Sequence, residues 1–93
     1  MGKKPRPKPK RLAEKLLQIR NSLGLSQSEM FSRLDIERLA EVKRISDYET
    51  GKSEPPLEVL LQYARVASIC VERLIDDKLD LPARLPSKSK HRC

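Results

Sequence analysis

The segment Val-Lys-Arg-Ile-Ser-Asp-Tyr-Glu-Thr-Gly-Lys, residues 42–52, has the pattern of a short amphipathic helix followed by a stop signal. Ile45, Tyr48 and Glu49 share one face at helical spacing, and Gly51 can adopt the left-handed conformation that ends many helices. The opposite face carries polar residues, namely Lys43, Arg44, Ser46 and Asp47. We therefore predict a helix over about 42–50 that is anchored on one side and exposes charged side chains on the other.

The residues before this segment predict two more helices. An apolar stripe at steps of four, three and four predicts a helix over about 11–23, with Gly24 at its end; the stripe consists of Leu12, Leu16, Ile19 and Leu23. Ser26 and Glu29 have the spacing of a capping box, in which each side chain accepts a hydrogen bond from a backbone N–H at the start of a helix. This predicts a second helix over about 27–34.

Helical phase places a break between this second helix and residues 42–50. At about 100° per residue, Ile36 and Ile45 would lie about 180° apart on one continuous helix. Both residues could not then face the same core. We therefore expect the chain to leave the helical conformation near Leu39 to Glu41.

The residues after Gly51 predict two further short helices. Pro56 suits the first turn of a helix, and the apolar residues that follow predict a helix over about 57–67 with Leu57, Leu60, Leu61 and Ala64 as its buried stripe. A last helix, about 71–77, is expected to present Val71, Leu74 and Ile75 to the core. The predicted fold class is therefore all-α, with five short helices.

The composition predicts one small domain flanked by two basic tails. Of 93 residues, 38% are hydrophobic and only 3% aromatic, so the core should be aliphatic and a large catalytic cleft is not expected. The net charge of +7 resides in the tails, because residues 12–83 contain 10 basic and 13 acidic residues. We divide the chain into a disordered basic arm (1–10), a helical domain (11–79) and a basic tail (80–93). Such arms suit a polyanionic partner, either nucleic acid or an anionic membrane surface; we do not expect a membrane partner, because no apolar helix face is flanked by bulky anchors.

Several classes of function find no support in the sequence. The chain has no apolar run of membrane-spanning length and no secretory leader, and two cysteines suit a reducing compartment, so we expect a cytoplasmic protein. Cys70 is expected to be a small buried residue. His91, Cys70 and Cys93 supply at most three metal ligands, one fewer than a structural zinc site needs. No catalytic motif is present, so we expect neither an enzyme nor a cofactor, a metal or a small-molecule substrate.

Several motifs in this order resemble the lambda-repressor-like (Cro-type, also called Xre) helix-turn-helix proteins. The matching residues are Leu-x-x-Ile-Arg-x-x-x-Gly-Leu-Ser-Gln at 16–27, Ile-Ser-x-Tyr-Glu-x-Gly-Lys at 45–52, Pro56, and Leu-Leu-x-Tyr-Ala at 60–64. The connection between the second and third helices looks about four residues longer than the usual family pattern. The resemblance implies a compact five-helix domain with flexible basic tails, and a DNA-binding transcriptional regulator of bacterial or phage type, such as a repressor, that acts as a homodimer.

The resemblance also places the third helix, about 42–50, in the major groove of double-stranded DNA. Lys43 and Arg44 can donate to guanine, Ser46 can bond either a base or a phosphate, and Asp47 can accept from cytosine. Further backbone contacts are expected from Gln27, Lys52, Lys8 and Lys10. By resemblance, Arg20 and Glu49 form a structural ion pair that joins the first helix to the third.

Other functions remain possible on the sequence alone. Residues 12–83 carry a net charge of −3, which is also compatible with a protein-interaction module, such as an antitoxin or an adaptor, whose tails attach to nucleic acid without specificity. RNA binding is less favoured, because Phe31, Tyr48 and Tyr63 are the only rings and their phases are mainly inward. For a homodimer, the last helix and residues 80–85 are the expected interface.

Overall fold

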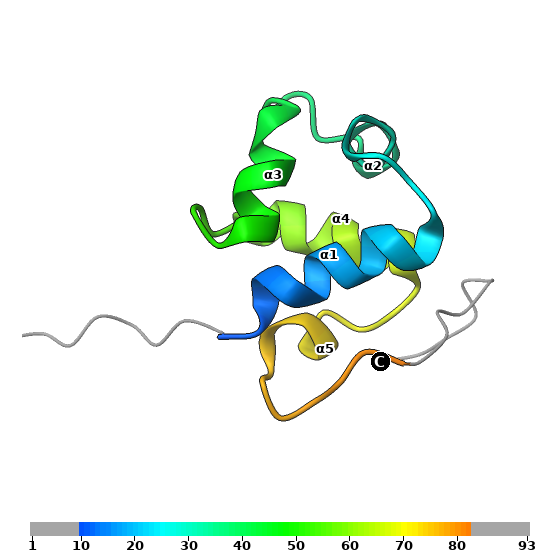
Figure 1. The fold of residues 1–93 in the computed structure, drawn as a ribbon, viewed down its shortest axis with the longest axis vertical. Coiled ribbons are helices and arrows are strands. Elements are labelled where there is room, and N and C mark those ends of the chain that lie inside the picture. The colour runs from blue at the N-terminus through cyan, green and yellow to red at the C-terminus, as the bar shows by residue number, and fades with distance from the viewer. Residues whose placement is uncertain (1–9, 83–93) are drawn as a thin grey trace, which may run out of the picture.

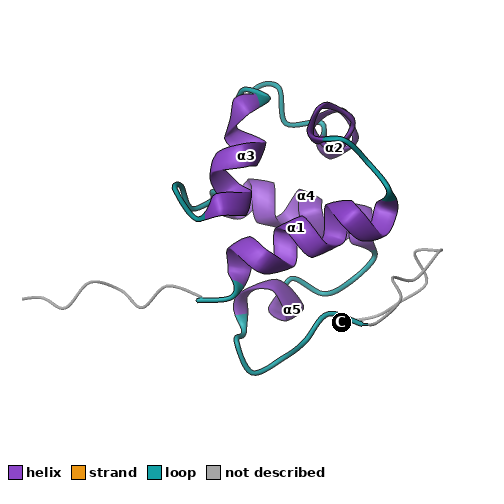
Figure 2. Cartoon of the chain, in the orientation of Figure 1, coloured by secondary structure: helices purple, strands orange, loops and turns teal. Residues whose placement is uncertain are grey.

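The computed structural model describes residues 10–82, and these residues form five α-helices and no strand (Figures 1 and 2). The helices are α1 (Leu12–Leu23), α2 (Gln27–Leu34), α3 (Lys43–Thr50), α4 (Leu57–Ala67) and α5 (Glu72–Ile75). The predicted all-α fold class is confirmed. Helix α1 crosses the middle of the molecule, with α2 and α3 on one side of it and α5 on the other (Figure 1).

Local signals end and begin the first helices as predicted. Gly24 and Gly51 both have left-handed backbone angles, with φ of 71° and 81°. At the start of α2, the Ser26 hydroxyl accepts from the Glu29 N–H at 3.1 Å, and the Glu29 carboxylate accepts from the Ser26 N–H at 2.8 Å. These two hydrogen bonds complete the predicted capping box. Hydrogen bonding of the Glu29 carboxylate to the backbone N–H and then to the side chain of Ser26 lowers the pKa of Glu29, because it stabilises the charged form.

The break between α2 and α3 is also confirmed. Asp35 adopts a left-handed conformation with φ of 55°, and the Ile36 carbonyl then accepts from the N–H groups of Leu39 and Ala40 at 2.8 and 3.0 Å. The Ile36 side chain is fully buried. The connection therefore runs from residue 35 to residue 42. The buried Ile36 side chain anchors it to the core before α3 begins at Lys43.

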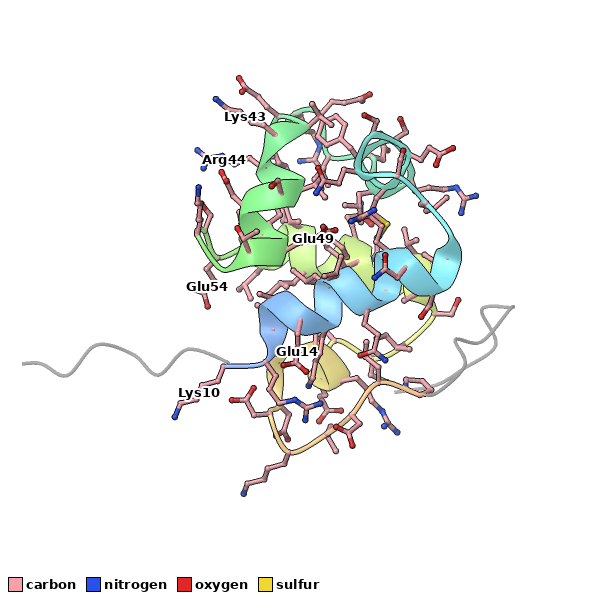
Figure 3. The ribbon with its side chains drawn as sticks, viewed as in Figure 1. Lys10, Glu14, Lys43, Arg44, Glu49 and Glu54 are labelled. Carbon is pink, nitrogen blue, oxygen red and sulfur yellow. The ribbon has the colours of Figure 1, made fainter. Side chains whose placement is uncertain are left out.

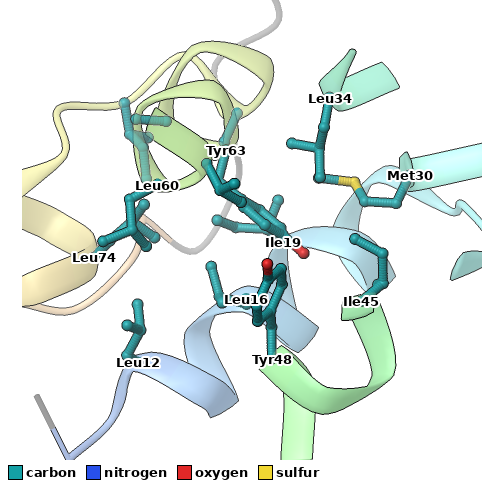
Figure 4. Close-up of a cluster of buried hydrophobic side chains, with 14 of the residues drawn as sticks. Leu12, Leu16, Ile19, Met30, Leu34, Ile45, Tyr48, Leu60, Tyr63 and Leu74 are labelled. Carbon is teal, nitrogen blue, oxygen red and sulfur yellow. The ribbon is translucent and has the colours of Figure 1, made fainter. Parts of the chain in front are cut away.

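A single aliphatic core joins the helices. Side chains from α1, α2, α3 and α4 meet at its centre, where Leu16, Ile19, Met30, Leu34, Ile45 and Tyr63 lie together (Figure 4). Tyr63 is fully buried, and its hydroxyl has no hydrogen-bond partner among residues 10–82. Burial raises the pKa of this hydroxyl well above its ordinary value. The phenol is therefore neutral and acts as a core side chain.

The predicted buried stripe of α4 is partly wrong. Leu57 is 80% exposed and Leu61 is 42% exposed, whereas Val59, Leu60, Tyr63, Ala64 and Ala67 face the core. Val59, Tyr63 and Ala67 are spaced four residues apart and therefore share one face of the helix. The structure turns this face, with the large Tyr63 ring, toward the core, so the buried face of α4 differs from the predicted one. Similarly, Leu74 is buried in α5, but Ile75 is exposed and Val71 is half-buried.

The chain after α5 packs against the start of α1, and these contacts continue past residue 79, the end of the predicted domain. Helix α5 ends at Ile75, two residues earlier than predicted, because Asp76 takes an extended conformation. The Asp77 carboxylate then accepts from the backbone N–H groups of Lys10 and Arg11 at 2.9 and 3.0 Å. Leu81 is buried in the core, and the Arg11 guanidinium lies 2.6 Å from the Asp80 carboxylate. The packed domain therefore reaches Leu81.

A buried lysine reinforces this junction. The Lys15 side chain on α1 is fully buried, and its ammonium donates to the carbonyls of Arg73 and Asp76 at 2.7 and 2.9 Å. Burial lowers the pKa of Lys15. These carbonyls lie at the end of α5, so Lys15 satisfies acceptors that a helix terminus leaves open.

Two other sequence expectations concern residues in or near this region. Cys70 is half-buried and disulfide-bonded, so the prediction of a small buried residue is wrong, and the disulfide does not fit the reduced cysteines expected from the sequence. The basic arm, which was predicted to be disordered, and the basic tail lie outside the described residues, except for Lys10 and residues 80–82. Between residues 10 and 82, no helix has the length and apolar character needed to cross a bilayer.

Candidate nucleic-acid interface

Helix α3 exposes its first basic residues on the side away from α1. Lys43 and Arg44 extend outward from the beginning of the helix (Figure 3). The Lys43 side chain is 75% exposed, and its ammonium lies 3.6 Å from the Glu41 carboxylate. Exposed ion pairs of this kind contribute little, about 0–1 kcal/mol. Lys43 can therefore exchange Glu41 for another anion or acceptor at low cost.

Arg44 is more constrained than Lys43. One terminal nitrogen of its guanidinium lies 3.5 Å from the Asp47 carboxylate and donates to the Ser53 hydroxyl at 3.3 Å. Asp47 is half-buried beneath this contact. Asp47 therefore orients Arg44, and its carboxylate is already partly engaged. The other predicted residue of this face, Ser46, is also half-buried, so it is less accessible than Lys43 and Arg44.

The opposite side of α3 is held by the predicted ion pair. Arg20 on α1 donates to both carboxylate oxygens of Glu49 on α3, at 2.7 and 3.0 Å. The Arg20 and Glu49 side chains are only 17% and 4% exposed. The hydrogen bond to Glu49 raises the pKa of Arg20. Because the pair is bidentate and shielded from water, it restricts the rotation of α3 about its own axis.

Gln27 belongs to the same buried network. Its side-chain amide donates to the Glu49 carboxylate at 3.2 Å, and Arg20 also donates to the Leu25 carbonyl at 2.9 Å. Glu49 therefore links α3 to α1 and to the start of α2. In this arrangement the Gln27 amide points toward Glu49. Gln27 is half-buried, so only part of its side chain is accessible to a ligand at the protein surface.

The fold also brings together two lysines from distant parts of the sequence. Lys10, before α1, and Lys52, after α3, both line a shallow cleft with Tyr48, Gly51 and Glu54. Both lysine residues are exposed, and Figure 3 shows Lys10 extending into solvent at the start of α1. Lys8, which the sequence places in the same basic arm, lies outside the described residues.

Sequence reasoning missed three features near this surface. Glu41 pairs with Lys43; the short spacing of opposite charges is a visible signal for that contact. Ser53 fixes Arg44, and no local pattern indicates it because the contact crosses the turn after α3. Thr50 is exposed, but its hydroxyl donates to the Ser46 carbonyl at 2.9 Å, as threonine often does within a helix.

The described residues show no site for a metal. Between residues 10 and 82, no group of three or more His, Cys, Asp or Glu side chains is placed to hold an ion. His91 and Cys93, which the sequence analysis weighed as ligands, lie outside this range. The chemistry available at the α3 surface is therefore hydrogen bonding and charge neutralisation by lysine, arginine, serine and aspartate side chains.

The family model described as helix-turn-helix matches residues 16–67, which run from the middle of α1 to the end of α4 and include the whole Arg20–Glu49 network. No curated protein and no solved structure matches the chain.

Proposed function

The chain belongs to the lambda-repressor-like helix-turn-helix family, and on that premise we propose that it is a sequence-specific transcriptional regulator of the bacterial or phage type. In this proposal α3 enters the major groove of double-stranded DNA, and the protein acts as a cytoplasmic homodimer that represses transcription. The observation that carries it is the two-sided arrangement of α3, with a buried bidentate ion pair behind the helix and exposed basic side chains in front.

The base contacts of this proposal come from the first turns of α3. Lys43 and Arg44 would donate to guanine O6 and N7, and Asp47 would accept from cytosine N4. The contact between Arg44 and Asp47 supports the role of Arg44, because a guanidinium that is already oriented loses less conformational freedom on binding. Ser46 would bond either a base edge or a phosphate.

The backbone contacts come from the surfaces around α3. Lys52, Lys10 and Lys8 would neutralise phosphates, and the cleft shared by Lys10 and Lys52 supports placing both on the same side of the duplex as α3. Gln27 would contribute to backbone contact from the start of α2, with the part of its side chain not engaged by Glu49. Each phosphate neutralised lowers the logarithm of affinity by about 0.9 per tenfold increase in salt.

The homodimer follows from the size of the module. One short recognition helix reads few base pairs, and related symmetric regulators bind two half-sites about one helical turn apart. The sequence favoured α5 and residues 80–85 as the interface. Among the described residues of that surface, Ile75 is exposed, whereas Leu81 is used in the protein's own core, so Ile75 is an apolar residue available for subunit contact.

The test is selection of duplexes from a random pool by the full chain, followed by affinity measurement. We expect one pseudo-palindromic sequence, and we expect its enrichment to disappear in Lys43→Ala/Arg44→Ala. The matched control is Arg65→Ala/Lys78→Ala, which removes the same charge from exposed positions outside α3 and should retain the preferred sequence. Loss of preference in the control, or retention in the α3 variant, would contradict the proposal.

A second candidate is supported by the net charge of −3 over residues 12–83. It is a protein-interaction module, such as an antitoxin or an adaptor, whose basic tails hold nucleic acid without sequence preference. The same selection distinguishes the two functions. For this candidate, enrichment stays flat across the pool while binding remains sensitive to salt, and deletion of residues 2–10 reduces the salt dependence.

A further inference from the structure

One apolar side chain stands among the charged residues at the start of α3. Four large hydrophobic residues between positions 10 and 82 are exposed, namely Val42, Leu57, Leu61 and Ile75. Val42, which is 42% exposed, is the one that adjoins α3, and its neighbours Glu41, Lys43 and Arg44 are all exposed and charged.

The core does not require the exposed part of Val42. Ile36 and Ile45, which flank Val42 in the sequence, are both fully buried and anchor this part of the chain in the core. Val42 already has helical backbone angles, with φ of −57° and ψ of −33°, and its carbonyl accepts from the Ile45 N–H at 3.1 Å. Its position is therefore set by the backbone of α3, while part of its side chain remains in water.

A valine in this position has properties suited to reading DNA. The residues at the N-terminal end of a recognition helix are the ones that approach base edges. In the major groove the one apolar group of the four bases is the C5-methyl of thymine. Because valine is branched at Cβ, its methyl groups are held in few rotamers, so little conformational freedom is lost on contact.

We propose that Val42 is a specificity-determining residue that packs against the C5-methyl of one thymine in each half-site. This inference rests on the proposed function, since it needs α3 in the major groove. It adds an apolar contact to the polar contacts of Lys43 and Arg44 and predicts that a thymine is part of the preferred sequence. Moving one methyl group out of water corresponds to about a fourfold change in affinity.

The experiment removes the methyl groups from each partner in turn. Every thymine of the selected duplex is replaced singly by deoxyuridine, which lacks only the C5-methyl, and affinities are measured for the wild type, Val42→Ala and Val42→Thr. We expect one thymine per half-site at which the wild type loses about fourfold in affinity. At the same thymine, replacement by deoxyuridine should lower the affinity of Val42→Ala by less than about twofold, which is half of the wild-type loss on a logarithmic scale. Val42→Thr keeps one methyl group, so its loss should lie between those of Val42→Ala and the wild type.

Leu57→Ala supplies the matched control. Leu57 is an exposed aliphatic residue on α4, so this variant should reproduce the deoxyuridine profile of the wild type. If selection gives a preferred duplex, but deoxyuridine lowers the affinity of Val42→Ala as much as that of the wild type, the inference about Val42 is wrong. The proposed function as a regulator is not affected by that result. Selection without any preferred duplex overturns both. A profile that changes equally in Leu57→Ala and Val42→Ala also overturns the inference, because the effect would not be specific to α3.

Discussion

Glu49→Ala tests whether the buried network behind α3 supports the fold. The Glu49 carboxylate accepts two hydrogen bonds from Arg20 and one from Gln27, and both members of the ion pair are largely shielded from water. The substitution leaves the Arg20 guanidinium buried with only the Leu25 carbonyl as acceptor. Breaking a buried pair in this way costs about 3–5 kcal/mol, a large part of the stability of a small domain.

The measurement is the free energy of unfolding from urea denaturation. Glu49→Gln keeps an acceptor oxygen but loses the charge, so we expect a smaller loss, about 1.5–3 kcal/mol. Glu58→Ala is the matched control because it breaks the Arg38–Glu58 pair at 3.5 Å, in which both side chains are about two-thirds exposed; it should cost less than about 1 kcal/mol. If Glu49→Ala is no more costly than Glu58→Ala, the network does not hold α3 and the argument for its fixed orientation fails.

Three further perturbations test other parts of the fold. Hydrogen bonds from the backbone of Lys10 and Arg11 lower the pKa of Asp77 below its ordinary value of 3.8, so ionised Asp77 stabilises the fold above that pH and the contribution is lost as the pH falls through the lower, folded-state pKa. Below about pH 4, the unfolding temperature of Asp77→Asn should therefore fall less steeply with decreasing pH than that of the wild type. An equally steep fall in both proteins would show that the contact is absent. Ser26→Ala removes the capping-box acceptor of α2 and should reduce the free energy of unfolding by about 1 kcal/mol, whereas Ser28→Ala, two residues later and also exposed, should change it little. Tyr63→Phe removes a buried hydroxyl that has no partner among residues 10–82 and should leave stability unchanged or raise it by about 1 kcal/mol; a clear loss in calorimetry would reveal a partner for the hydroxyl.

Local interactions explain why the helix positions were predictable from sequence. The Ser26–Glu29 capping box, Gly24 and Gly51 each act within one turn of the backbone, so their effect does not depend on the rest of the fold. The break before α3 followed from the opposite phases of Ile36 and Ile45, both of which prove to be fully buried. The pairing of Arg20 with Glu49 came from the family pattern, and the structure contains it.

The errors concern contacts between segments that are distant in the sequence. The leucine spacing in α4 allowed more than one buried face, and Leu57 was placed on the wrong one because packing around Tyr63 sets the rotation of the helix. Lys15 was not singled out, since its buried ammonium depends on carbonyls at the end of α5. The contacts of Asp77 and Asp80 with the start of the domain, and the burial of Leu81, were not predicted because they leave no periodic signal in the sequence.

The surface that we propose faces DNA shows the same division between local and tertiary causes. The amino-acid order by itself determined that α3 has an apolar side and a basic side, since helical geometry distributes neighbouring residues around the axis. The tertiary structure decided which polar groups remain available: Gln27 is drawn toward Glu49, Arg44 is held by Asp47 and Ser53, and Lys43 and Val42 extend into solvent. Availability depends on what lies across from each side chain, and that is set by how the helices pack.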